Sequence, residues 1–256
     1  MNILDVLIFG FVEGVTEFLP ISSTGHLMLT ARLLHLAPSE FVKSFQIAIQ
    51  LGAVLSVAVV YRKQLAGGSR IWKHLLVAFL PAAIIGGFFY AVIKRYLLAS
   101  SQVVLWSLFL GGLFLVVFEF FYRQKENAVD DLARISYPQA LLIGLFQSVA
   151  MIPGVSRSAA CIVGGLAAGL KRRVVVEFSF LLAIPTMLAA TALDLFKSAH
   201  SFSGTEFIYL GAGFIVSFLV AMAAIKLLLL FIQKHTFISF GIYRMALAVL
   251  FWFFIR

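Results

Sequence analysis

The sequence predicts an all-α protein that crosses a membrane several times. The chain has 256 residues, of which 62% are hydrophobic and 12% are charged, and its mean hydropathy is +1.05. Soluble domains contain about 25% charged residues. Here the apolar residues also form long blocks instead of amphipathic stripes. Because about 20 apolar residues span a bilayer, the length allows roughly six to eight spans in one membrane domain, 1–256.

The first half is expected to contain two short helices followed by three spanning helices. An apolar helix over 1–18 is broken by Pro20, and a second short helix begins at Ser23 or Thr24 and runs to Leu36. Each is too short to cross a bilayer alone, so together they predict a re-entrant hairpin, or a broken helix whose irregular backbone lies inside protein. The spanning helices are expected over 40–61, 74–93 and 103–122.

The second half repeats this order of elements. A short apolar segment over 138–152 ends at Pro153, and a short helix follows over 157–170. Three spanning helices are then expected over 174–195, 207–232 and 238–255.

Local similarity between the halves predicts a duplication. The hexapeptide SFQIAI at 44–49 matches SFLLAI at 179–184, and the two proline breaks lie at corresponding places. We therefore predict repeat 1 over about 1–124 and repeat 2 over about 136–256. A returning hairpin plus three spans makes an odd number of crossings. The second repeat is thus expected to be inverted, an architecture in which discontinuous helices meet near the midplane.

Basic residues predict the orientation. Eleven of the twenty Lys and Arg residues lie in the loops expected over 62–74, 123–137, 171–173 and 233–236. By the positive-inside rule these loops are cytoplasmic and both termini lie outside the cytoplasm. The same rule explains the net charge of +9, so no nucleic-acid partner is expected. The N-terminus does not resemble a removable signal peptide, and the single cysteine excludes an intrachain disulfide.

A dense polar segment, EGVTEFLPISSTGH at 13–26, interrupts the apolar sequence. Polar groups in hydrocarbon are costly unless they are satisfied, so this segment indicates a functional site. Glu13 and Glu17 are four residues apart and share a helix face. They either hold a divalent cation, or the charge of one keeps the other protonated. The structural alternative is a solvated helix end.

The hydroxyl groups after Pro20 indicate an anion site. Ser22, Ser23 and Thr24 begin a helix, where free N–H groups and the helix dipole favour phosphate, although ordinary N-capping needs one such hydroxyl. His26 shares a helix face with Ser23, a spacing that fits a nucleophile and its proton acceptor, or alternatively a packed histidine.

The second break, PGVSRS at 153–158, adds an arginine. Arg157 lies between Ser156 and Ser158 at a helix start, and guanidinium is a strong phosphate ligand. Snorkelling to the interface is the alternative, but no other charge occurs between Arg134 and Lys171. If the two breaks meet, their side chains fit hydrolysis of a phosphoric anhydride on a substrate with a lipid tail.

These motifs resemble those of a known family, the undecaprenyl-diphosphate phosphatases or bacitracin-resistance proteins. EGVTEFLPISSTGH is similar to the first signature of that family and PGVSRSAACIVGG to the second, and IQLG at 49–52 and IYR at 242–244 are supporting matches. The resemblance covers the whole chain. It departs in the second signature, where Ala159 and Cys161 replace a glycine and a threonine, which affects the geometry expected of a phosphate pocket.

The resemblance implies a membrane hydrolase that removes the terminal phosphate of undecaprenyl diphosphate and so recycles the lipid carrier for peptidoglycan synthesis, cell wall biogenesis, cell shape and bacitracin resistance. It implies a divalent cation, Mg²⁺ or Ca²⁺, in a site on the periplasmic side of the bacterial inner membrane, and it allows a homodimer. A lipid-phosphate transporter or flippase is the alternative function. By position, Glu13 and Glu17 match the acidic pair that would hold the metal. Ser23 matches the nucleophile and His26 its acid/base partner. The residues that match the phosphate contacts are Ser22, Thr24, Ser156, Arg157 and Ser158.

Overall fold

The computed structural model describes residues 1–37, 39–92, 100–198 and 203–255, and within these ranges the regular structure is helical apart from one isolated β-bridge between Val129 and Leu170. In chain order the elements are α1 (Ile3–Thr16), α2 (Ser23–Leu33), α3 (Glu40–Val60), α4 (Arg62–Ala66), α5 (Ser69–Val92), α6 (Ser101–Phe121), the short 3₁₀ helix η2 (Leu132–Arg134), α7 (Tyr137–Val149), α8 (Arg157–Ala167), α9 (Arg172–Ser198), α10 (Gly204–Phe231) and α11 (Ile238–Ile255).

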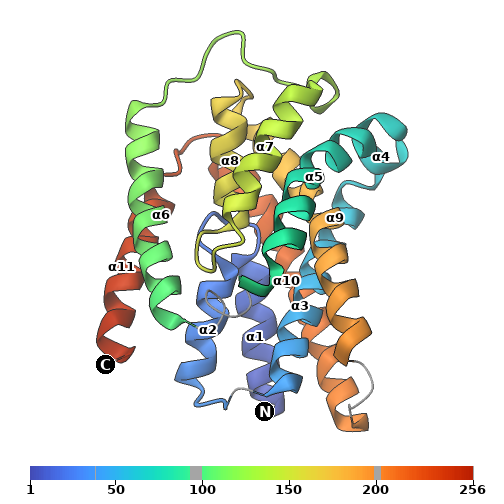
Figure 1. Ribbon diagram of the computed structural model, residues 1–256, viewed down its shortest axis with the longest axis vertical. Helices are drawn as coiled ribbons and strands as arrows, with labels where there is room; N and C mark the ends of the chain where they lie inside the picture. The colour runs from blue at the N-terminus through green and yellow to red at the C-terminus, as the bar shows by residue number, and fades with distance from the viewer. Residues whose placement is uncertain (38, 93–99, 199–202, 256) are drawn as a thin grey trace.

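Four of the described helices, α3, α5, α6 and α10, are long and apolar enough to cross a bilayer. The long helices α9 and α11 run alongside them (Figure 1). The prediction of an all-α multi-pass membrane protein is therefore confirmed. The expected spans correspond to these six helices, with residue 93 of the span predicted over 74–93 lying outside the described residues.

Two helical hairpins enter the bundle from opposite ends. In Figure 1, α1 and α2 extend from the end that carries the N-terminus to the middle and back, while α7 and α8 do the same from the other end. The chain reverses where the prolines were noted: α1 ends at Thr16, before Pro20, and α7 ends at Val149, before Pro153. An inverted repeat would produce this arrangement, and the duplication itself stays a prediction.

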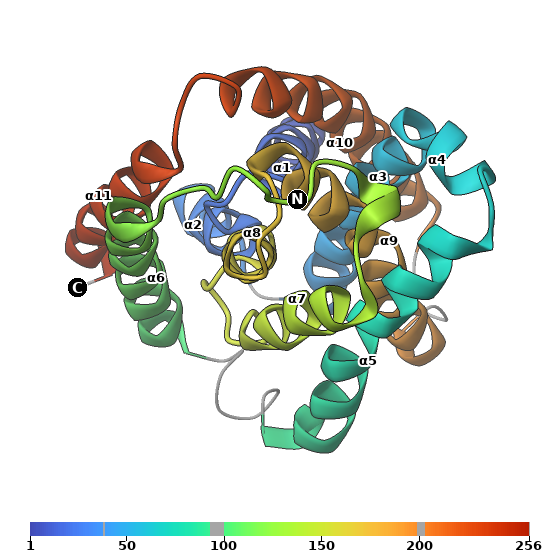
Figure 2. The ribbon, with the colours of Figure 1, turned by 90° about the horizontal axis from the view of Figure 1, so that it is seen from above.

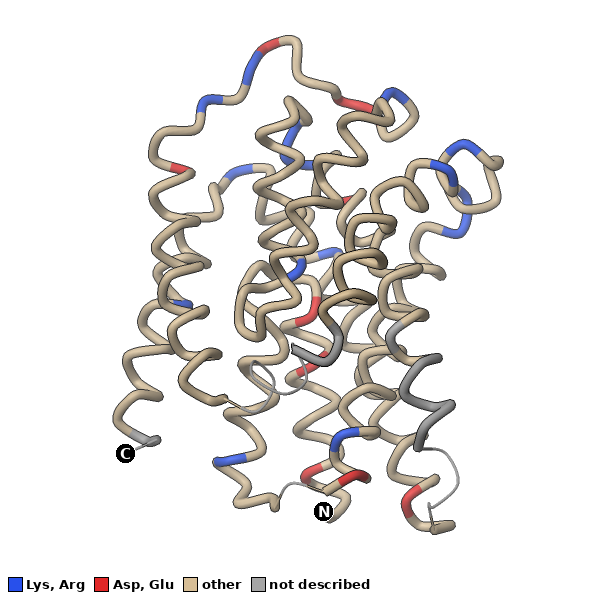
Figure 3. Tube along the Cα trace, in the orientation of Figure 1, with Lys and Arg blue, Asp and Glu red and all other residues tan. Residues whose placement is uncertain are grey.

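Charged residues are unevenly divided between the two ends of the bundle. Lys and Arg gather at the end where α4 and the loop between α6 and α7 lie, and both termini lie at the opposite end (Figure 3). Large apolar side chains such as Phe88, Phe120 and Phe253 are exposed on the outer surface of the bundle, where lipid would surround them. The surface therefore has the polarity of a membrane protein.

Close helix packing depends on glycine at two contacts. A Cβ on Gly52 of α3 would lie 2.4 Å from the carbonyl oxygen of Phe214 in α10, and one on Gly144 of α7 would lie 2.1 Å from that of Ala78 in α5. Because no side chain fits in these spaces, the helix backbones approach each other directly. These contacts fix α3 against α10, and they fix α7, one of the two helices of the α7–α8 hairpin, against α5.

Helices α6 and α11 pack against each other at one side of the bundle, whereas α8 lies near its middle (Figure 2). An ion pair joins this α6–α11 pair to α9: both terminal nitrogens of Arg172 bind the buried carboxylate of Glu119. The Arg172 guanidinium also lies 5.5 Å from the ring centre of Tyr122 and 5.6 Å from that of Phe237. A buried two-point ion pair with aromatic neighbours holds the α6–α11 pair in a defined position.

Candidate active site

The two short helices α2 and α8 begin in the same unusual way. Their N-cap residues, Ser22 and Ser156, have φ of 72° and 73°, a left-handed conformation that non-glycine residues rarely adopt. Each side chain accepts a hydrogen bond from the backbone N–H three residues later, Gly25 at 3.4 Å and Ala159 at 3.2 Å. Strain of about 1–3 kcal/mol at such residues is typical of functional sites. Both serines therefore act as caps, and both turns are held under strain.

The two breaks are in direct contact. Arg157 of α8 donates from Nη2 to Glu17 Oε1 at 2.5 Å, and the Ser158 hydroxyl donates to the backbone carbonyl of Phe18 at 2.8 Å. The Arg157 and Glu17 side chains are 9% and 3% exposed, so the ion pair is withdrawn from solvent. Nη1 of Arg157 donates to the carbonyl of Ser179 at 2.8 Å. The prediction that the two breaks touch is confirmed.

Ser23 is bonded to a carboxylate rather than to histidine. Its hydroxyl donates to Glu17 Oε2 at 2.6 Å, so one carboxylate binds both Ser23 and Arg157. The structure does not join Ser23 and His26 by a hydrogen bond, because both imidazole nitrogens have other partners. Their roles as nucleophile and acid/base partner stay predictions. Residues three apart share a helix face, but the turn at 17–22 places the carboxylate closer to the hydroxyl.

His26 is held between the first break and the last helix. Its Nδ1 lies 2.8 Å from the carbonyl of Ser22, and its Nε2 lies 2.8 Å from the hydroxyl of Tyr243 in α11. The two rings are parallel within 6°, with centres 5.6 Å apart. Sequence reasoning noted Tyr243 only within a supporting match and gave it no role, because nothing local links it to a residue 217 positions away.

Glu13 is the least satisfied group of the site. It is fully buried, and neither carboxyl oxygen has a hydrogen-bond partner among the described residues. A buried carboxyl group without a partner is costly and points to a missing proton or cation. No group of three or more His, Cys, Asp and Glu side chains with metal-binding geometry occurs in the described ranges. Glu13 and Glu17 therefore fit a cation only if other oxygen ligands complete its coordination.

The remaining predicted residues have simple placements. Thr24 is exposed at the start of α2, and the phosphate contacts of Thr24 and of the serines stay predictions. The two departures from the family pattern lie in α8: the N–H of Ala159 donates to the side chain of the Ser156 cap, and the Cys161 thiol is buried 3.6 Å from Gln147 Oε1. Cys161 thus belongs to the contact between α7 and α8.

Arg244 is a second buried arginine that sequence reasoning left without a role. It is fully buried, and its Nη2 donates to the carbonyls of Ser107 at 3.1 Å and Gly154 at 3.0 Å. A Cβ on Gly111 would lie 2.2 Å from that nitrogen, so glycine makes room for the guanidinium. Its signal in the sequence was a charge inside an apolar span, which is expensive unless it is functional or bonded. Here it anchors the second break to α6 and α11.

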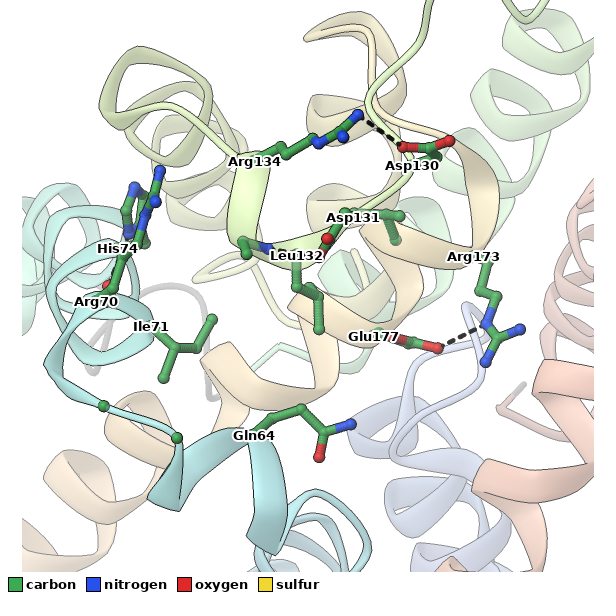
Figure 4. A pocket seen from close by; sticks show the side chains of 14 residues that line it. Gln64, Arg70, Ile71, His74, Asp130, Asp131, Leu132, Arg134, Arg173 and Glu177 are labelled. Carbon is green, nitrogen blue, oxygen red and sulfur yellow. Dashed lines mark hydrogen bonds and ion pairs between the residues drawn. The ribbon is translucent and has the colours of Figure 1, made fainter.

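A cavity of about 790 Å³ lies at the basic end of the bundle, between the α4–α5 region, η2 and the start of α9 (Figure 4). Four of its charged side chains form ion pairs: Arg173 with Glu177 at 2.8 Å, and Arg134 with Asp130 at 3.8 Å. None of the predicted site residues lines it. We therefore place the candidate active site at the two breaks and not in this cavity.

The fold and the site define a multi-pass membrane protein with a buried, charged centre where two helical hairpins meet. The chain belongs to the family of the bacitracin resistance protein BacA, whose model matches residues 6–250. A protein of Persephonella marina named undecaprenyl-diphosphatase is 47% identical over 255 residues, covering 100% of both chains. A protein of the same name from Aquifex aeolicus is 47% identical, and the match covers 96% of each chain. Another from Wolinella succinogenes is 46% identical, and the match covers 100% of this chain and 99% of the relative.

Proposed function

We propose that this protein is an undecaprenyl-diphosphatase, which removes the terminal phosphate of undecaprenyl diphosphate and leaves the monophosphate. This reaction recycles the lipid carrier of peptidoglycan synthesis, and it links the protein to cell wall biogenesis, cell shape and bacitracin resistance. The names of full-length relatives support the activity. The observation that carries it is the Arg157–Glu17–Ser23 contact, which assembles a phosphate ligand, a carboxylate and a hydroxyl in one buried site.

Arg157 is the proposed ligand of the substrate phosphates. Two of its nitrogens are bonded within the protein, and its Nε is buried without a partner among the described residues. A guanidinium has five N–H donors, so this arginine retains donors for phosphate oxygens. Its charge would offset the negative charge that the oxygens carry in the transition state. The serines of both breaks and Thr24 are the further phosphate contacts that we propose.

Ser23 and Glu17 form the proposed reaction pair. The Ser23 hydroxyl donates to Glu17 at 2.6 Å, which is within reach for transfer of its proton when the oxygen attacks phosphorus. Expulsion of the monophosphate then leaves a phosphoserine, which water hydrolyses. His26 remains the proposed acid/base group that moves protons in these steps. Attack by water or by the imidazole would leave the serine unmodified, so trapping the intermediate separates these routes.

A divalent cation, Mg²⁺ or Ca²⁺, is the proposed cofactor, with Glu13 and Glu17 as its protein ligands. The support is the fully buried Glu13 carboxyl group, whose oxygens have no hydrogen-bond partner among the described residues. Oxygen ligands suit both ions. When bound, the cation would supply positive charge next to the diphosphate oxygens.

The proposed location is the bacterial cytoplasmic membrane, with the basic loops inside and the site open to the periplasmic side. The support is the excess of Lys and Arg at one end of the bundle (Figure 3). A homodimer is the proposed assembly to be tested by mass measurement in detergent. Among the described contacts, none favours a flippase over a hydrolase. Lipid flux into liposomes that survives Glu13→Gln and Glu17→Gln would add that second activity.

The test is phosphate release from a prenyl diphosphate by purified protein with Mg²⁺ or Ca²⁺. We expect Arg157→Ala and Glu17→Ala to lose nearly all activity, since each removes a group that touches the reacting phosphate or its attacking oxygen. Arg62→Ala is the matched control, because Arg62 is exposed at the start of α4. Wild-type protein that releases no phosphate from such lipids would refute the proposed function.

A further inference from the structure

The contact between His26 and Tyr243 is a feature of the site that the proposed chemistry leaves unexplained. The Tyr243 hydroxyl lies 2.8 Å from His26 Nε2, and the rings stack with centres 5.6 Å apart. Tyr243 comes from α11, whereas the rest of the site comes from the two hairpins and the turns after α1 and α7. A helix remote in sequence therefore holds a reacting side chain of the first break.

The partner on the other ring nitrogen determines what Tyr243 does. The Ser22 carbonyl can only accept, so Nδ1 of His26 carries a proton, and in the neutral ring Nε2 is the basic nitrogen. The Tyr243 hydroxyl then donates to Nε2. After Nε2 takes up a proton, the same hydroxyl can rotate and accept from it. Tyr243 can thus bond the imidazole both before and after the proton transfer.

The attachment of α11 makes this contact rigid. The next residue, Arg244, bonds the carbonyl of Gly154 in the second break and that of Ser107 in α6. Adjacent residues of one helix therefore attach to the first and to the second break. Arg244 is fully buried, and its two hydrogen bonds fix the position of α11 along its axis and its rotation about that axis. They thereby fix the position of the Tyr243 hydroxyl.

A second histidine–tyrosine stack provides a comparison. His74 and Tyr137 are parallel within 4°, with ring centres 4.5 Å apart, at the basic end of the bundle. His74 Nδ1 also lies 2.7 Å from a backbone carbonyl, that of Arg70. In the described part of the chain, however, no hydrogen bond joins the Tyr137 hydroxyl to His74. The hydroxyl contact is therefore particular to the stack in the site.

We propose that Tyr243 is a positioning residue for the hydrolase reaction. Its hydroxyl holds the His26 imidazole in a fixed orientation. Nε2 then exchanges protons with the reacting groups when its bond to the hydroxyl opens. The inference rests on the proposed function and deepens it, because it assigns to α11 a part in catalysis that involves no contact with the substrate. It predicts that Tyr243 acts only through His26.

The experiment is a double-mutant cycle on phosphate release from a prenyl diphosphate, with Tyr243→Phe, His26→Asn and both together. Tyr243→Phe keeps the stacked ring and removes the hydroxyl. We expect kcat to fall about tenfold and KM to stay within about twofold of the wild-type value. The expected fall in kcat is smaller than the full contribution of an acid–base group, because His26 itself remains. In the His26→Asn background the same change should have no further effect. Tyr137→Phe is the matched control and should keep wild-type kinetics.

Nitrogen NMR of labelled histidine gives a readout independent of activity. The His26 signals, identified by their loss in His26→Asn, should show the Nδ1–H tautomer, and Tyr243→Phe should shift Nε2 while Tyr137→Phe leaves it unchanged. If the wild type is active but Tyr243→Phe has the same kinetics as Tyr137→Phe, the Tyr243 proposal is overturned and the proposed function stands. The same conclusion follows if Tyr243→Phe lowers kcat equally with and without His26. A wild type that releases no phosphate refutes the proposed function, and this proposal with it.

Discussion

Replacement of Arg157 by methionine separates the structural from the chemical part of the Arg157–Glu17 pair. The two side chains are 9% and 3% exposed and joined at 2.5 Å. Charges roughly 4 Å apart attract by about 4 kcal/mol at an effective dielectric constant of about 20. Arg157→Met therefore leaves the Glu17 carboxylate buried without its counter-charge. The free energy of unfolding should fall by about 3–5 kcal/mol, the usual cost of breaking a buried ion pair from one side.

A second change should recover most of that loss. Glu17→Gln in the Arg157→Met protein removes the remaining charge, and the new amide oxygen can still accept from the Ser23 hydroxyl. An apolar replacement of a buried pair is often neutral, but the Ser179 carbonyl also loses its donor. An unsatisfied buried group costs about 1–3 kcal/mol. We therefore expect the free energy of unfolding of the double variant to lie within about 2 kcal/mol of that of the wild type. Neither variant should release phosphate.

The measurements are SDS-induced unfolding in mixed micelles and phosphate release from a prenyl diphosphate, with Arg62→Met as the control for loss of an exposed arginine. A double variant as unstable as Arg157→Met would refute the reasoning, because the damage would then not come from the unpaired carboxylate. A cost below about 1 kcal/mol for Arg157→Met would show instead that water reaches the pair.

Two further predictions concern packing and pH. Gly52→Ala should lower the free energy of unfolding by about 1–3 kcal/mol, since its Cβ would lie 2.4 Å from a backbone oxygen. Gly211→Ala in α10, with no atom within 4 Å of its Cβ, should be neutral or slightly stabilising. Equal effects of the two changes in SDS unfolding would contradict this. In the loop before α7, the hydrogen bond from Lys171 lowers the pKa of the Asp130 carboxyl. A carboxylate with a lowered pKa in the folded state stabilises the fold above its unfolded pKa, about 4, and loses this contribution as pH falls through the lowered value. The difference in unfolding free energy between wild type and Asp130→Asn should therefore be present at neutral pH and vanish in acid, and a difference independent of pH would disprove the coupling.

The sequence by itself determined the class of protein and which two segments form the candidate site. Long apolar blocks with few charges require helices in a bilayer, because only helices and closed barrels satisfy their own backbone groups there. Pro20 and Pro153 marked where the chain reverses, since proline cannot continue a helix. The polar residues of both breaks stood out because they are expensive in apolar surroundings. That Arg157 would reach the first break followed from the expected pairing of the two halves.

Only the tertiary structure decided which of these groups bind one another. Helix periodicity relates residues three or four apart, and on that basis Ser23 was paired with His26, but the turn after α1 places Glu17 at the hydroxyl instead. His26 is held by Tyr243, 217 residues away, and that contact depends on how α11 packs on α6. Local sequence fixes which side of a helix a residue occupies, whereas its distant partner depends on the packing of whole helices.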